Sequence, residues 1–133
     1  MATTASRPDT AKAEETQTGL DENVAATLAY VLGWVTGIVM YFVESDNDTV
    51  RFHAAQSIVV FGGVTIAAMA LNFAQLMVQF GDFVGLILGP IFGLLGLVIW
   101  LGALAAWIYL IVQTYQGNDP RIPVAAGIAE DLV

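Results

Sequence analysis

The stretch Phe83–Val112, FVGLILGPIFGLLGLVIWLGALAAWIYLIV, decides the fold class because it carries no charged side chain. A helix rises about 1.5 Å per residue, so this run would be about 45 Å long, whereas the hydrocarbon core of a bilayer is about 30 Å thick. The run is therefore predicted to cross a membrane, with a spanning part at about 86–112. Gly89 and Pro90 interrupt it, and proline removes one backbone hydrogen bond from a helix. We expect one long helix kinked at Pro90, in preference to a short re-entrant segment followed by a second helix.

Two more apolar runs precede this one. Val24–Val43 contains no charge, and Val50–Phe80 is apolar apart from scattered polar side chains. Between them, Glu44–Thr49 is too polar to enter lipid. The sequence thus predicts an all-α integral membrane bundle of three transmembrane helices, with spans at about 24–43, 53–78 and 86–112.

The two ends of the chain are polar tails flanking a membrane domain predicted at 19–116. Residues 1–18 have few large apolar side chains and are expected to form a disordered acidic tail, with no signal peptide. Gly117 and Pro120 end the last helix. In the tail 117–133, apolar residues recur at helical spacing, which predicts either a short amphipathic helix at the membrane interface or a frayed end.

Composition excludes several classes of function. The chain is 57% hydrophobic, its mean hydropathy is +0.72, and its net charge is -8. A chain this acidic lacks the basic patch that nucleic acid or an anionic lipid surface requires. The absence of cysteine excludes disulfides and thiolate sites, and no cofactor or metal is expected. The acidity suits a halophilic source, although an acidic solvated tail explains the same charge.

Small residues recur every four positions in two of the predicted helices. Such stripes let helix backbones approach closely, and they mark helix-packing faces in membranes. The two stripes are Ala25, Ala29, Gly33, Gly37 and Gly81, Gly85, Gly89, Gly93.

The second predicted helix has two distinct faces when its residues are projected at about 100° each. The polar stripe consists of His53, Ser57, Thr65, Asn72, Gln75 and Gln79. The opposite face is small, with Gly63, Ala67, Ala70 and Ala74. Neither face suits lipid, so this helix is predicted to be central, with other helices or a second protomer on both sides. The polar stripe is interpreted either as interhelical hydrogen bonding or as the lining of a water-filled path.

His53 is the only histidine, and no acid lies within helical reach of it except near the loop at the membrane surface. We interpret it as a hydrogen-bonded residue at a helix entrance, with a proton switch as the alternative. Asp82 is expected to be a turn or N-cap residue. No nucleophile, base and acid converge in the sequence, so we expect no catalytic residues and no enzyme.

The run Arg51, Phe52, His53, Gln56, Ser57, together with the opening residues 21–24 and the closing Gly117, resembles a family of small prokaryotic membrane proteins of unknown function. That family is distantly similar to the chloroplast inner-envelope import component of the Tic-twenty type. The resemblance covers about 19–132. It implies a three-helix membrane protein without an established activity, whereas the plant relative belongs to a protein-import complex.

These features favour a multi-pass protein of the cell membrane that acts as a structural or assembly component. Its expected partners are the lipid bilayer and either a second copy of itself or another membrane protein. The alternative is a small channel or transporter subunit that uses the polar stripe of the second helix. The basic residues are expected to be divided evenly between the two sides of the membrane. Arg7 and Lys12 precede the first helix, whereas Arg51 and Arg121 lie on the other side. We expect the first loop and the C-terminus to be cytoplasmic and the N-terminus to be outside.

Overall fold

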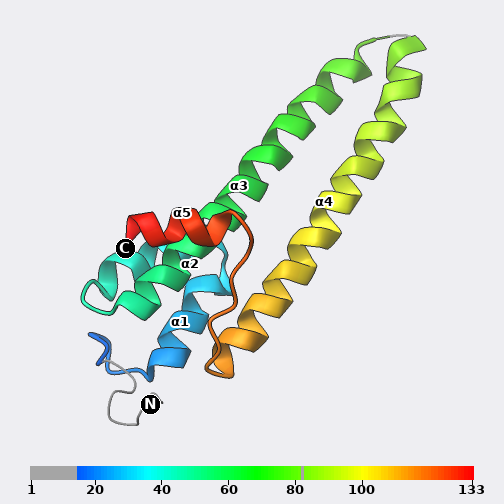
Figure 1. The fold of residues 1–133 in the computed structure, drawn as a ribbon. Helices are drawn as coiled ribbons and strands as arrows, with labels where there is room; N and C mark the ends of the chain where they lie inside the picture. The colour runs from blue at the N-terminus through cyan, green and yellow to red at the C-terminus, as the bar shows by residue number, and fades with distance from the viewer. Residues whose placement is uncertain (1–14, 82) are drawn as a thin grey trace.

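The computed structural model describes residues 15–81 and 83–133, which form helices and connecting segments without any strand. The helices are α1 (Glu22–Val31), α2 (Trp34–Val43), α3 (Asp48–Gln79), α4 (Phe83–Tyr115) and α5 (Ala125–Leu132). The predicted all-α class is confirmed. Figure 1 shows α3 and α4 as a long antiparallel hairpin, with the three short helices gathered around one end of it.

The helix predicted over Val24–Val43 is broken in the middle, so the prediction of one unbroken first span is wrong. α1 and α2 have 10 residues each and are separated by Leu32 and Gly33. A helix of this length is about 15 Å long, half of what a bilayer requires. Gly33 has φ 64° and ψ -132°, a conformation that L side chains rarely adopt. The hydroxyl of Ser57 on α3 donates to the carbonyl of Gly33 at 2.9 Å and holds the break in place.

α1 and α2 fold back on each other as a hairpin of short helices. Ala25 of α1 and Met40 of α2, far apart on either side of the break, belong to one buried cluster. Beyond the helices, the carboxylate of Glu44 accepts hydrogen bonds from the backbone N–H groups of Gln17 and Thr18. The segment before α1 and the loop after α2 therefore lie at the same end of the molecule. This arrangement does not favour the expectation that they lie on opposite sides of a membrane, which stays a prediction.

Replacing Gly33 by alanine is expected to destabilise the protein by about 1–3 kcal/mol, because the backbone there is strained for any residue with a Cβ. The new Cβ would also lie 3.2 Å from the Cβ of Phe61. Thermal or denaturant unfolding in detergent measures the change. Gly102→Ala is the matched control, because its Cβ would meet no atom within 4 Å and alanine favours the helix. Equal stability of Gly33→Ala and the wild type would contradict this account of the break.

α3 and α4 are the two helices long and apolar enough to cross a membrane, with 32 and 33 residues. The expectation of three spanning helices is thereby reduced to two candidates. α4 continues through Pro90, so the prediction of one long helix is confirmed, while a kink at Pro90 stays a prediction. The outer part of the hairpin has no other helix beside it in Figure 1, and its apolar side chains are exposed, as at Ile66 (69%) and Leu86 (72%).

α5 packs across the base of α3. Its alanines, Ala125, Ala126 and Ala129, are buried, whereas Ile128 and Leu132 are exposed. Of the two interpretations of the C-terminal tail, the structure supports a helix. A location at the membrane interface stays a prediction.

The small-residue stripes are placed differently in the two halves of the chain. Ala25 and Ala29 are fully buried between α1, α2 and α3, and Gly37 of α2 is so close to α3 that a Cβ would lie 3.0 Å from the carbonyl of Ala54. In the other stripe, a Cβ on Gly85 would collide with the carbonyl of Val78. The remaining glycines are less tightly packed: Gly81 approaches the same carbonyl, Gly89 faces the Gln75 amide, and Gly93 meets nothing within 4 Å.

Three of the four residues on the small face of α3 are left uncovered by the described chain, and the fourth, Ala74, is half-buried. Gly63, Ala67 and Ala70 are exposed, and a Cβ on Gly63 would meet no atom within 4 Å. Within one copy, protein does not cover both faces of this helix, and contact of the small face with a second protomer stays a prediction. The reason is the break at Gly33, which shortens α1 and α2 so that they reach only the base of α3.

Candidate functional site

The candidate site is a buried polar cluster where α1, the base of α3 and the segment after α4 meet. Tyr30, His53 and Gln56 are all 0% exposed. The Tyr30 hydroxyl lies 2.8 Å from Nδ1 of His53 and accepts a hydrogen bond from Nε2 of Gln56 at 2.9 Å. Nε2 of His53 lies 2.9 Å from Oδ1 of Asp119. The cluster thus joins three segments that are distant in sequence.

The Gln56 amide also holds the segment that follows α4. Its Nε2 donates to the carbonyl of Pro120 at 2.9 Å, and its Oε1 accepts from the backbone N–H of Ile122 at 2.8 Å. A backbone N–H can only donate, so this last bond fixes which amide atom is the oxygen. Gln56 is therefore fully used, with one bond to α1 and two to the C-terminal segment.

The partners of the cluster also determine where its protons lie. The amide nitrogen of Gln56 can only donate, so the Tyr30 oxygen accepts and its own O–H is directed to Nδ1 of His53. In the tautomer in which Nδ1 accepts this bond, the proton lies on Nε2 and is donated to the carboxylate of Asp119. The chain Gln56, Tyr30, His53, Asp119 is a continuous run of hydrogen bonds in one direction.

A second polar cluster lies next to it and ties the segment before α1 to the loop after α2. Glu44 is 0% exposed and accepts from Gln17 N at 2.5 Å, Thr18 N at 3.2 Å and the Thr18 hydroxyl at 2.5 Å. Asn47 is the N-cap of α3, accepting from Val50 N at 2.9 Å, while its amide donates to the Glu22 carboxylate at 3.0 Å. A buried carboxylate with three donors is well satisfied.

The motif residues at the start of α3 all take part in these contacts. Arg51 donates to the carbonyl of Ser45 at 3.1 Å, and its guanidinium lies 4.3 Å from the centre of the Tyr41 ring. The ring of Phe52 lies 5.4 Å from the ring of His53. With His53, Gln56 and Ser57 already placed, the motif is a set of tertiary contacts around the base of α3.

The predicted polar stripe divides into two parts. Near the base, the hydroxyl of Thr65 accepts a hydrogen bond from Nε1 of Trp34 at 3.1 Å. Like His53 and Ser57, Thr65 thus has a hydrogen-bond partner on another segment. Farther along, Asn72 is exposed, and its amide donates to the carbonyl of Ala68 in its own helix. Gln79 is exposed, and Gln75 faces α4. Within one copy, Asn72 is thus bonded to its own helix and does not bridge two helices.

A small cavity of about 50 Å³ adjoins His53 at the end of the bundle. It is lined by polar groups that include Glu22, Thr114 and Asp119. The hydroxyl of Thr114 is buried, and no partner for it is found in the described part of the chain. A polar space of this volume accommodates one or two water molecules.

Tyr30, His53 and Asp119 have the order hydroxyl, imidazole and carboxylate that nucleophilic catalysis uses. The geometry nevertheless favours a structural role, because the Tyr30 hydroxyl is enclosed and already bonded on both sides. Within 15–81 and 83–133, no group of three or more His, Asp or Glu side chains could hold a metal ion. Asp82 lies outside the described residues.

Sequence reasoning missed Tyr30, Glu44 and Asp119. Asp119 is 66 residues from His53, and no local pattern connects them. The one signal available was the pair His53 and Gln56, which are one helical turn apart and both polar at the start of an apolar helix.

Comparison with known proteins places these features in a family context. The sequence model of the magnetosome magnetite crystal formation protein family matches residues 21–129. A UPF0132 membrane protein of Methanocaldococcus jannaschii is 34% identical over 116 residues, covering 87% of this chain and 92% of the relative. A UPF0132 membrane protein of Archaeoglobus fulgidus is 33% identical over 114 residues, covering 86% and 97%.

No solved structure matches this chain. The relatives agree with the resemblance to small prokaryotic membrane proteins of unknown function. They lend no support to the distant similarity with the chloroplast import component.

Proposed function

This chain belongs to the magnetosome magnetite crystal formation protein family, and from that premise we propose that it is a non-enzymatic structural component of a membrane assembly. The relatives' names describe membrane proteins, and α3 and α4 have the length and hydropathy to cross a bilayer. In this proposal the two long helices anchor the protein and associate with other copies. The short helices form a folded base on one side of the membrane.

The proposed topology follows from the contacts at the base. Residues 17 and 18 bond to Glu44, and the amide of Asn23 donates to the carbonyl of Tyr115 at 2.7 Å. The segment before α1, the loop before α3 and the end of α4 therefore share one end of the molecule. The turn between α3 and α4 lies at the other end (Figure 1). This arrangement supports two crossings, with both described chain ends on the same side.

The observation that carries the proposal is the uncovered small face of α3. Gly63, Ala67 and Ala70 lie on one side of a helix that is predicted to be in lipid, and the described chain places nothing over them. Lipid does not push helices together, so close packing of backbones at small residues is a main source of helix association in membranes. A second copy that presents the same face would bury both stripes.

Replacing small residues on this face by large ones is expected to convert a self-associated form into monomers. The double variant Gly63→Leu, Ala67→Leu places two large side chains where backbones would touch, so we expect the apparent dissociation constant to rise at least about tenfold. Sedimentation or light scattering in detergent measures the oligomer.

Ala105→Leu is the control, because it places a leucine at an exposed alanine of α4, away from the small face of α3. Cross-linking through single cysteines at Ala70 provides a second measurement, since the natural chain has no cysteine of its own. A wild-type protein that stays monomeric at every concentration in lipid and detergent, with no cross-link at Ala70, would refute self-association.

The alternative function, a small channel or transporter subunit, has one observation in its favour. Asn72 and Gln75 line a cavity between α3 and α4 within the predicted spans. Flux of ions or small solutes into liposomes that contain the pure protein would support this alternative. Complete protection of a cysteine at Ala68 from a water-soluble thiol reagent would count against it.

The family's description refers to magnetite crystal formation, and we do not extend that activity to this chain. Acids are present at the base, among them Asp21, Asp46 and Asp48, but they are exposed and dispersed. Nothing in the described geometry gathers them into a set of ligands. The proposal therefore rests on helix association and not on mineral binding.

A further inference from the structure

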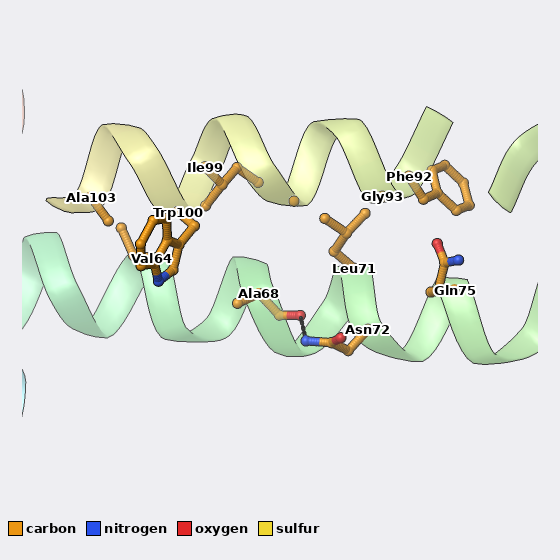
Figure 2. A pocket seen from close by; sticks show the side chains of 11 residues that line it. Val64, Ala68, Leu71, Asn72, Gln75, Phe92, Gly93, Ile99, Trp100 and Ala103 are labelled. Carbon is orange, nitrogen blue, oxygen red and sulfur yellow. Dashed lines mark hydrogen bonds between the residues drawn. The ribbon is translucent and has the colours of Figure 1, made fainter. Parts of the chain in front are cut away.

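A cavity lies between α3 and α4, in the part of the hairpin that no other helix covers. Its volume is about 360 Å³. At one end, Val64 faces Trp100 and Ala103; at the other, Gln75 faces Phe92 (Figure 2). Every residue that lines it is uncharged. Because the cavity is flanked only by the two predicted spans, it opens to the hydrocarbon of the bilayer and not to water.

Glycine creates the space on the α4 side. Gly93 lines the cavity, and a Cβ there would meet no atom within 4 Å. Gly96 also lines it, where a Cβ would lie 3.3 Å from Cδ2 of Leu71. A leucine at Gly93 would extend into empty volume. Helices that needed only to touch each other would have no such void, because a void in a packed interior loses dispersion contacts.

One polar atom of the cavity, Oε1 in the side-chain amide of Gln75, is buried without a hydrogen-bond partner in the described chain. The other amide, that of Asn72, is already bonded to the carbonyl of Ala68 at 2.8 Å, as Figure 2 shows. An unpaired buried acceptor costs about 1–3 kcal/mol, so it requires an explanation. The last side-chain torsion of glutamine is broad, and rotation about it turns either amide atom toward the cavity.

We propose that this cavity binds a neutral, lipid-soluble molecule that carries one hydrogen-bond donor, with the donor meeting the Gln75 amide. Small-molecule sites are mostly apolar and aromatic, contain a few polar groups and measure about 300–1,000 Å³, and this cavity has each of those properties. A charged ligand is excluded because no opposite charge lines the walls. The proposal goes beyond a role in assembly and does not depend on self-association.

The test uses two probes that differ by one donor, naphthalene and 2-naphthol. Equilibrium dialysis measures their uptake by nanodiscs that contain the full chain, and uptake by empty nanodiscs is subtracted. We expect saturable binding of both probes, with 2-naphthol bound about two- to tenfold more tightly, which is the value of one hydrogen bond. In Gln75→Leu this preference should disappear.

Gly93→Leu should weaken the binding of both probes at least about tenfold, because the new side chain occupies the cavity. Gly102→Leu is the matched control, since a Cβ there also meets nothing within 4 Å and this glycine does not line the cavity; it should bind like the wild type. Helix content measured by circular dichroism confirms that each variant is folded.

Two results would overturn the proposal. The first is uptake by the wild type that does not exceed that of empty nanodiscs. The second is an equal loss of binding in Gly93→Leu and Gly102→Leu. If the wild type takes up no probe and Gly93→Leu instead dissociates an oligomer, the cavity receives a second copy of the chain and not a small molecule. The proposed assembly role is measured separately by the oligomeric state, so it can stand or fall independently.

Discussion

Replacing Gln56 by leucine is expected to destabilise the protein by about 3 kcal/mol, the value of three neutral hydrogen bonds in a buried site. Leucine keeps the bulk but removes the bonds to Tyr30, Pro120 and Ile122. The segment that links α4 to α5 would lose both of the bonds that Gln56 makes to it. We therefore expect faster proteolysis between Gly117 and Val124 as well as a lower midpoint of unfolding in detergent.

The control for this variant is Gln79→Leu, which makes the same chemical change at an exposed position of the same helix. It should leave both the unfolding midpoint and the proteolysis of the C-terminal segment unchanged. If Gln56→Leu behaved like Gln79→Leu, the polar cluster would not be what holds the C-terminal segment to α3.

Replacing Glu44 by alanine is expected to destabilise the protein by about 3–5 kcal/mol. Three hydrogen bonds to a charged group would be worth about 4.5–9 kcal/mol at about 1.5–3 kcal/mol each, and the loss is smaller because Gln17 and Thr18 are exposed and water replaces part of it. The change leaves the N–H groups of Gln17 and Thr18 and the Thr18 hydroxyl without their acceptor. Amide hydrogen exchange should become faster at residues 17 and 18, and the unfolding midpoint should fall.

Asp46→Ala is the matched control, because it removes an exposed acid from the same loop. Its free energy of unfolding should lie within about 0.5 kcal/mol of the wild-type value. Unchanged exchange at residue 17 in Glu44→Ala would show that the segment before α1 is not held by this carboxylate.

Hydropathy and helix length were sufficient to predict an all-α membrane protein, the α3 and α4 helices, and the continuity of α4 through Pro90. These features depend on composition over long windows, where each residue contributes a little and single errors average out. The helical C-terminal tail was one of two alternatives, because eight residues give a periodicity too short to decide.

The break at Gly33 was missed for a physical reason. A glycine within an apolar run is equally compatible with a packing stripe and with a turn, and hydropathy does not distinguish the two. The deciding contact is made by the hydroxyl of Ser57, which lies 24 residues away and donates to the carbonyl of Gly33. The break leaves two candidate spanning helices instead of three, so the side of the N-terminal segment depends on the proposed topology.

The candidate site was predicted only in part. His53 and Ser57 were selected as polar residues of an apolar helix, and Gln56 as part of the family motif. Ser57 and Thr65 bond across to the segment around the break. Their partners Tyr30 and Asp119 could not be predicted, because each comes from a segment whose position depends on the whole topology. Asn72, another polar residue of the predicted stripe, donates to a carbonyl of its own helix.

The side of the membrane on which each connecting segment lies tests the account most directly. Because the natural chain has no cysteine, single cysteines at Glu15, Asp46, Gly81 and Asn118 each provide one label site, and all four positions are exposed. A membrane-impermeant maleimide is applied to oriented vesicles from one side and then from the other. The account predicts that positions 15, 46 and 118 are labelled from the same side and position 81 from the opposite side. Labelling of position 15 and position 46 from opposite sides would show an unbroken first span and would contradict the account.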